Sequence, residues 1–230
     1  MRMRSVAVAA GLMLFLGGWL APSVTAAPLT VSLSNGITTV TCADGAACDT
    51  SPLTGVVSFT SPVSTITLSL TGVGSGSPAL PGLMMDLAYN VTQTVAGTGG
   101  TMVIQASETD QTANAALFHA VLGGTQLTGT TAFSIFDSAT NTLFAQTASI
   151  CSAGPASTAG AVALSCDGGP LTGAAFSLTE IVTLQIPAGA YSGSGDLLLT
   201  ARQQVPAPSA LLLLGLGLSV AGVLRVRVRL

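Results

Sequence analysis

The chain has 230 residues, a formal net charge of −3 at neutral pH, no lysine and a single histidine. Charged residues make up only 7% of it, and hydrophobic residues make up 49%. Nucleic-acid binding needs a cluster of basic side chains that neutralises phosphates. The basic residues here are six arginines, five of them near the two chain ends, so we exclude nucleic acid as a partner.

Residues 1–26 have the pattern of a secretory signal peptide. Two arginines precede an apolar run, 6–20, and residues 24–26 are small. A charged start, an apolar centre and small residues before the cut define such peptides. We therefore expect cleavage after Ala26, with a signal sequence retained as a membrane anchor as the alternative.

Residues 27–204 have the length of a single domain that can bury a core. All nine acidic residues lie in this region, against Arg202 as its one basic residue, which gives a charge of 1 − 9 = −8. An acidic surface without lysine suits a protein that stays soluble outside the cell.

The four cysteines indicate an oxidising compartment. They are Cys42, Cys48, Cys151 and Cys166, and an even number of cysteines in an exported chain predicts disulfides. Pairing within each local couple, Cys42 with Cys48 and Cys151 with Cys166, is the favoured one of the three possible connectivities. A zinc site is the alternative, although the spacing of two residues that is usual between zinc-binding cysteines is absent.

The first half of this region predicts short strands separated by turn residues. Asn35-Gly36 is typical of a two-residue hairpin turn. Ile66, Leu68 and Leu70 alternate with polar residues, which is the period of a strand with one buried face. The expected strands are 29–34, 37–41, 56–60, 63–70, 85–95 and 101–107, and the expected loops are 42–52 and 71–81.

The second half continues this pattern with weaker signals. Residues 113–122 fit a short helix as well as a strand, and we favour the strand because Gly123-Gly124 follow directly. Residues 151–173 predict a loop of small residues with one short strand, 161–165. The remaining expected strands are 132–136, 142–148, 174–186 (the longest) and 196–201.

About ten strands without an amphipathic helix predict an all-β fold, an antiparallel β-sandwich. A β-helix is the alternative architecture. It requires a fixed repeat period, and the glycine- and threonine-rich turns of this chain have no common spacing.

His119 shares one strand face with Leu117 and Val121. A catalytic base needs a nucleophile and an orienting acid beside it, and no nucleophile motif is present. We therefore expect a partly buried or rim histidine, and no metal or cofactor site.

Three carboxylates are the other candidates for chemistry. Glu108 and Asp110, two residues apart, could point the same way and bind a cation or act as acid and base on a glycan; loop carboxylates in solvent are the alternative. Glu180 lies on the apolar face of its predicted strand, where a carboxylate needs a partner. Either that strand turns its other face inward, or Glu180 reaches water at the sheet rim.

Residues 205–230 have three parts in a fixed order. The motif Val205, Pro206, Ala207, Pro208 and Ser209 precedes an uncharged apolar run, 210–224, and Arg225, Arg227 and Arg229 follow it. As a helix the run spans roughly 22 Å, which snorkelling arginines and a thinned bilayer can match to a membrane. The arginines hold the C-terminus on the cytoplasmic side, so we expect a single C-terminal transmembrane helix.

This order of motif, apolar helix and arginine cluster resembles the PEP-CTERM sorting signal of Gram-negative bacteria, although the central glutamate of that motif is Ala207 here. The resemblance covers the last 26 residues. It implies recognition and processing by an exosortase, a membrane enzyme with a catalytic cysteine, after which the protein passes to the surface or an exopolysaccharide matrix. A C-terminal anchor that is never cut is the alternative.

The resulting expectation is an exported, exosortase-sorted protein of the cell envelope or extracellular matrix, with a structural or interaction role and no enzymatic activity. Its partners would be the exosortase, the inner membrane transiently, and exopolysaccharide. A carbohydrate-binding module for the matrix polymer is the second hypothesis, and a glycan-active enzyme is the third.

Overall fold

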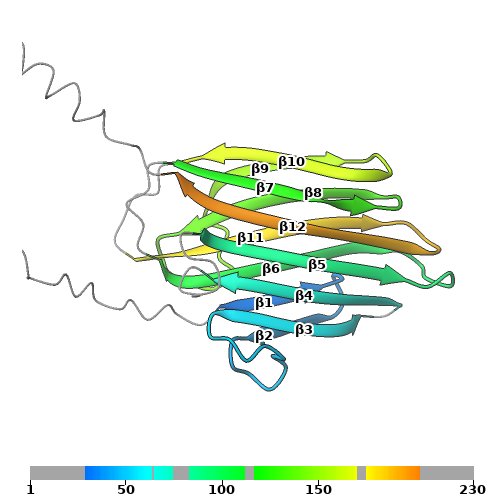
Figure 1. Ribbon diagram of the computed structural model, residues 1–230, viewed down its shortest axis with the longest axis horizontal. Helices are drawn as coiled ribbons and strands as arrows, with labels where there is room; N and C mark the ends of the chain where they lie inside the picture. Colours follow the sequence, from blue (N-terminus) through cyan, green and yellow to red (C-terminus); the bar gives the residue numbers. More distant parts are fainter. Residues whose placement is uncertain (1–28, 64, 75–82, 112–116, 170–174, 203–230) are drawn as a thin grey trace, which may run out of the picture.

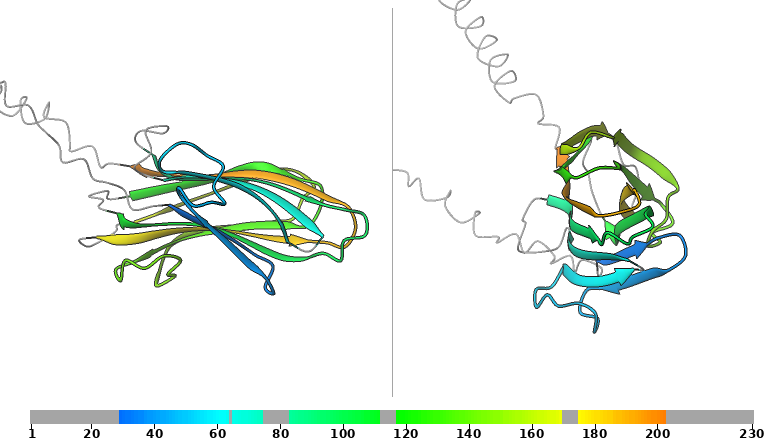
Figure 2. Two further views of the ribbon diagram at one scale, coloured as in Figure 1. Left: turned by 90° about the horizontal axis from the view of Figure 1, so that it is seen from below. Right: turned by 90° about the vertical axis from the view of Figure 1, so that its right-hand side faces the viewer.

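The computed structural model describes residues 29–63, 65–74, 83–111, 117–169 and 175–202. This part of the chain forms two six-stranded antiparallel sheets that lie one over the other (Figure 2). The expected all-β antiparallel sandwich is therefore confirmed. The signal peptide, the sorting motif, the apolar segment and the arginine tail lie outside the described residues. No helix in the described ranges has the length and apolar character needed to cross a membrane.

Sheet A has the strand order β2-β1-β6-β11-β8-β9. Its strands are β1 (Thr30–Ser34), β2 (Thr39–Ala43), β6 (Gly100–Gln111), β8 (Thr130–Ser138), β9 (Ala148–Ala156) and β11 (Phe176–Ile186). Sheet B has the order β10-β7-β12-β5-β4-β3. Its strands are β3 (Val56–Val63), β4 (Ile66–Gly74), β5 (Leu83–Gln93), β7 (Leu117–Gln126), β10 (Gly160–Gly168) and β12 (Tyr191–Arg202).

Strand direction reverses at every connection along the chain. All strand pairs are antiparallel, so the turns that follow β1, β3, β5, β7, β9 and β11 gather at one end, which we call the tip. The described chain enters at Leu29 and leaves at Arg202, both at the opposite end, which we call the base. Figure 1 shows that β1 begins and β12 ends on the same side of the sandwich, away from the tip turns.

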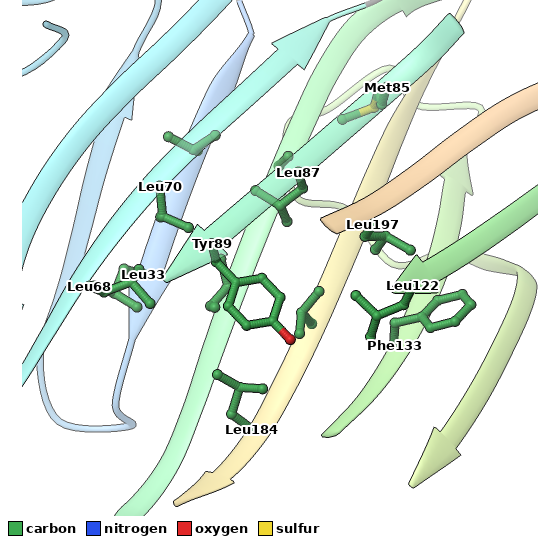
Figure 3. Close-up of a cluster of buried hydrophobic side chains, with 14 of the residues drawn as sticks. Leu33, Leu68, Leu70, Met85, Leu87, Tyr89, Leu122, Phe133, Leu184 and Leu197 are labelled. Atoms are coloured by element: carbon green, nitrogen blue, oxygen red, sulfur yellow. The ribbon is translucent and has the colours of Figure 1, made fainter. Parts of the chain in front are cut away.

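The core fills the space between the two sheets. In β4, Ile66, Leu68 and Leu70 are buried while Thr67 and Ser69 are exposed, as the alternation in the sequence predicts. The inner faces of the other strands supply further leucine, isoleucine, valine and phenylalanine side chains to one continuous cluster. Figure 3 shows how closely these side chains gather around the ring of Tyr89.

Tyr89 needs a glycine on the neighbouring strand. It lies directly opposite Gly195 of β12, and a Cβ atom at Gly195 would be only 2.5 Å from its ring. The Tyr89 ring therefore packs on the backbone of Gly195, and any larger residue at position 195 would displace the ring. Burial, followed by the nearby Tyr191, raises the pKa of the Tyr89 phenol, so this hydroxyl stays protonated and hydrogen-bonds to Thr131.

Two buried glutamine amides fix the turns at the tip. Gln93 Nε2 donates hydrogen bonds to the carbonyl oxygens of Pro187, at 2.9 Å, and Gly189, at 2.6 Å. Gln126 Nε2 donates to the carbonyl oxygen of Thr158 at 3.0 Å, and its Oε1 accepts a 2.6 Å hydrogen bond from Thr131. Each amide thus joins a strand end of sheet B to a turn between the sheets.

Replacing Gln126 by methionine tests this role. Methionine matches the length of glutamine but cannot donate, so the carbonyl oxygen of Thr158 and the Thr131 hydroxyl lose a buried partner. We expect a loss of about 2 kcal/mol in the free energy of unfolding, measured by urea denaturation. The matched control is Gln146→Met at an exposed position, which should change the free energy of unfolding little. Equal losses in the two variants would contradict the role of Gln126 in holding the turn.

Both disulfides have the local connectivity expected from the sequence. Cys42 at the end region of β2 pairs with Cys48 in the following loop, and Cys151 of β9 pairs with Cys166 of β10. Since β9 is an edge strand of sheet A and β10 an edge strand of sheet B, the second bond joins the two sheets along one side.

Removing the inter-sheet disulfide should cost more stability than removing the other one. The Cys151–Cys166 pair is separated by 15 residues and the Cys42–Cys48 pair by 6, and the longer loop restricts the unfolded chain more. We expect C151S/C166S to lower the free energy of unfolding by about 3 kcal/mol, and C42S/C48S to lower it by less. Thermal and urea denaturation of the two double variants checks the order, and the reverse order would contradict it.

Several expected strand boundaries are wrong. The expected strand 142–148 is mostly a connection, and the expected loop 151–173 contains most of β9 and β10. Gly123 and Gly124 lie inside β7 instead of ending it. Glycine is needed at position 124 because a Cβ atom there would be 2.2 Å from the backbone oxygen of Ser194 on β12. The first hairpin is correct, although its turn comprises the four residues 35–38.

Candidate functional site

The outer face of sheet B presents two carboxylate-containing pairs in the half nearer the base. This face is turned toward the viewer in Figure 1. The strand register brings side chains from β5, β7, β10 and β12 together there, although they are far apart in the sequence.

His119 and Asp167 form the first pair. They lie directly opposite one another on β7 and β10, and 2.8 Å separates Nδ1 of His119 from Oδ1 of Asp167. The His119 side chain is one-quarter exposed on β7, which has a neighbour on each side, so of the two expected positions the partly buried one is correct. The sequence did not identify Asp167 as the partner of His119, because this pairing depends on the register between β7 and β10, which leaves no pattern in the sequence.

Asp86 and Asp196 form the second pair. Burial, followed by a hydrogen bond that protonated Asp86 donates to Asp196 and by the charge of Asp196, raises the pKa of Asp86 to about 8. Asp86 Oδ1 is buried without a hydrogen-bond partner among the described residues, whereas Asp196 is exposed. At neutral pH Asp86 therefore carries a proton that the pair shares.

The two pairs are too far apart to act on one bond. Asp86 lies opposite Leu198, and His119 lies opposite Thr200, one side-chain row nearer the base and two strands away. At about 4.8 Å between strands and about 3.4 Å per residue, their separation is about 12 Å. The Thr200 hydroxyl donates a hydrogen bond to the backbone oxygen of His119 and is thus already engaged.

Glu180 is fully buried between the sheets. Its neighbours across the ladder are Ala106 and Ile135, both buried and apolar, and neither carboxyl oxygen has a hydrogen-bond partner in the described part of the chain. Burial, and then the charges of Asp86 and Asp196, raise the pKa of Glu180 well above its usual value. Both sequence-based interpretations of Glu180 are therefore wrong: its face points inward, and it does not reach water.

The raised pKa of Glu180 makes stability dependent on pH. The folded state holds its proton at a pH where the unfolded chain has released it, so the free energy of unfolding falls as the pH rises above the usual value of 4.5. Asp86, with a folded pKa of about 8, contributes in the same direction. Stability should therefore decrease from mildly acidic pH to about pH 8.

Two substitutions of Glu180 separate charge from polarity. Glu180→Gln should reduce the pH dependence and leave the part due to Asp86. Glu180→Leu should also raise the free energy of unfolding at pH 8 by about 2 kcal/mol, because it removes an unpaired buried polar group. Urea denaturation at several pH values measures both effects. A wild-type pH slope in Glu180→Gln would show that other groups cause it.

Glu108 and Asp110 do not face a common site as an acid pair, and the alternative of loop carboxylates in solvent is wrong for Glu108, which is buried in β6. Glu108 is buried at the base end of β6, whereas Asp110 is exposed and bound to Asn141 through both its backbone N–H and its carboxylate. Asp110 and Asn141 both adopt positive φ angles, and their contact holds the loop 139–147 against β6 in the middle of sheet A. In the described ranges no three histidine, cysteine or acidic side chains are placed to hold a metal ion.

The half of the outer face nearer the tip is uncharged and rich in hydroxyls. One side-chain row crosses five neighbouring strands, with Thr60, Ser69, Asn90, Ser194 and Thr125 directly opposite one another in turn. The next row toward the tip contains Thr67, Thr92 and Ser192. We call these eight residues the neutral rows; all are exposed except the partly exposed Ser194.

Acidic residues are confined to the base half and the middle of the sandwich. The nine acidic residues lie in the base connections, in the base halves of the strands or, for Glu180 and Asp196, at the middle of theirs. The tip turns carry the exposed apolar side chains Ile37, Val95 and Leu127 and no charged residue. The described molecule thus has a neutral half and an acidic half.

Comparisons with known proteins give no family. No protein-family model and no curated protein matches the chain. Among solved structures, the enzymatically active domain of tailspike protein 4 from bacteriophage CBA120 is similar in 64% of this chain and 19% of its own, with 12% identity and a TM-score of 0.37.

Proposed function

We propose that this chain is an exported protein of the cell envelope or extracellular matrix, sorted by an exosortase, whose sandwich has a structural or interaction role. The observation that carries the proposal is the position of Leu29 and Arg202 at the same end of the sandwich. Segments attached there, including the expected membrane-directed tail, would leave the tip pointing away from the membrane.

The covalent chemistry supports export. Both described disulfides need an oxidising compartment to persist. The acidic, lysine-free composition of residues 27–204 fits a protein exposed outside the cell. In this proposal the sorting signal consists of the motif Val205–Ser209, the apolar run 210–224 and the final arginines.

The mass of the mature chain tests the proposal. In a host with its exosortase we expect a protein that has lost residues 1–26 and the C-terminal tail, and whose mass lacks four hydrogens because of two disulfides. Deleting the exosortase should leave the full tail on a membrane-retained species. An unchanged mature C-terminus in the deletion strain would refute sorting by that enzyme, and free thiols would refute the oxidising compartment.

Binding of matrix exopolysaccharide is the second candidate function. It is favoured by the neutral rows, which are exposed on a continuous sheet face. The face has no exposed aromatic side chain in the described rows, so stacking on sugar rings would not provide the affinity.

A further inference from the structure

We infer that the neutral rows of sheet B form a docking face for an uncharged polysaccharide chain that runs across the strands. This inference rests on the proposed interaction role and specifies its ligand class and its site. It follows from the chemistry, spacing and rigidity of the rows, and from the distribution of charge around them.

Hydroxyl groups match a polyhydroxyl ligand in either direction. A serine or threonine hydroxyl both donates and accepts hydrogen bonds, and an asparagine amide offers both functions from two atoms. The longer row spans five strands, or about 19 Å at about 4.8 Å per strand, which is long enough to contact several consecutive sugar units. A protein partner would instead require a buried apolar or aromatic centre, which the rows do not contain.

The rows are held in place before any ligand binds. Thr60 and Ser69 share a 3.0 Å hydrogen bond, and Thr125 and Ser194 share one of 3.1 Å. Threonine side chains have few rotamers in strands, and short side chains lose little entropy on binding. Each contact is weak in water, but a polymer presents many equivalent units, so avidity supplies the affinity.

The surrounding charge selects against acidic polymers. Asp196 follows Ser194 by two residues on the same face of β12. The central region carries nine acidic residues and one arginine, so a uronate or sulfate polymer would be repelled. An uncharged chain meets no such repulsion on the neutral rows, and its binding should not depend on salt.

The test uses the chain purified with its ends as the host leaves them. It is mixed with insoluble cellulose, with curdlan and with the uncharged fraction of the host's own extracellular polysaccharide, and with alginate as the anionic probe. We expect sedimentation with at least one neutral polymer, equal at low and high salt, and none with alginate.

The variant Thr67→Val/Thr92→Val removes two adjacent hydroxyls from the shorter row while keeping the shape of the side chains. It should reduce binding about tenfold, whereas Thr147→Val, an exposed threonine between β8 and β9, should bind like wild type. Thermal denaturation confirms that both remain folded; should the double variant fail to fold, Asn90→Ala takes its place.

Wild-type binding by the double variant, binding to alginate alone, or no binding to any neutral polymer would overturn the inference. A wild-type dimer that the double variant dissociates would also overturn it, because the face would then be a protein interface. None of these outcomes bears on exosortase sorting, which the mature C-terminal mass tests independently.

Discussion

Antiparallel pairing with a reversal at every connection is the constraint on which the rest of the structure depends. Hydrogen bonding in the two ladders requires that each strand run opposite to its neighbours. With twelve described strands, this places six turns at the tip and both ends of the described chain at the base. The tip turns contain threonine, glycine, alanine and proline without charge, while the base connections and lower strands contain the carboxylates. The division into an uncharged tip half and an acidic base half thus follows from strand direction combined with where the acidic residues occur along the chain.

The strands with strong alternation could be predicted from the sequence. In the first half of β4 and along β5 large apolar residues occupy every second position, and these residues are buried as expected. In β9 and β10 the side chains are small and mostly exposed, and Cys151 and Val162 are the buried positions. Pairing with β8 and β7, together with the disulfide, holds these two strands in the sheets, and such long-range contacts leave no local pattern.

The candidate site could not be predicted for a related reason. Asp86 and Asp196 are 110 positions apart, and His119 and Asp167 are 48 apart; each pair meets only because the register aligns particular residues of different strands. A shift of one residue would turn every side chain of a strand to the other face. Glu180 is the opposite case, because its apolar face was evident from the sequence. The shortage of cations was evident too. What the sequence did not show is that the carboxyl stays in the core without a hydrogen-bond partner among the described residues, where keeping its proton is the way to avoid a buried charge.

The two long margins of the sandwich are closed by different chemistry. On one margin Cys151–Cys166 joins β9 to β10 covalently. On the other, Cys48 ties the loop after β2 back to sheet A, and the adjoining Asp49 accepts the backbone N–H of Ser58 on β3 in sheet B. Burial alone would raise the pKa of Asp49, but N–H donors from Ser58, Ser51 and Gly45 outweigh it and hold that pKa below its usual value. Acid protonates Asp49 and so weakens this contact on one margin, whereas the disulfide on the other margin does not respond to pH in this way.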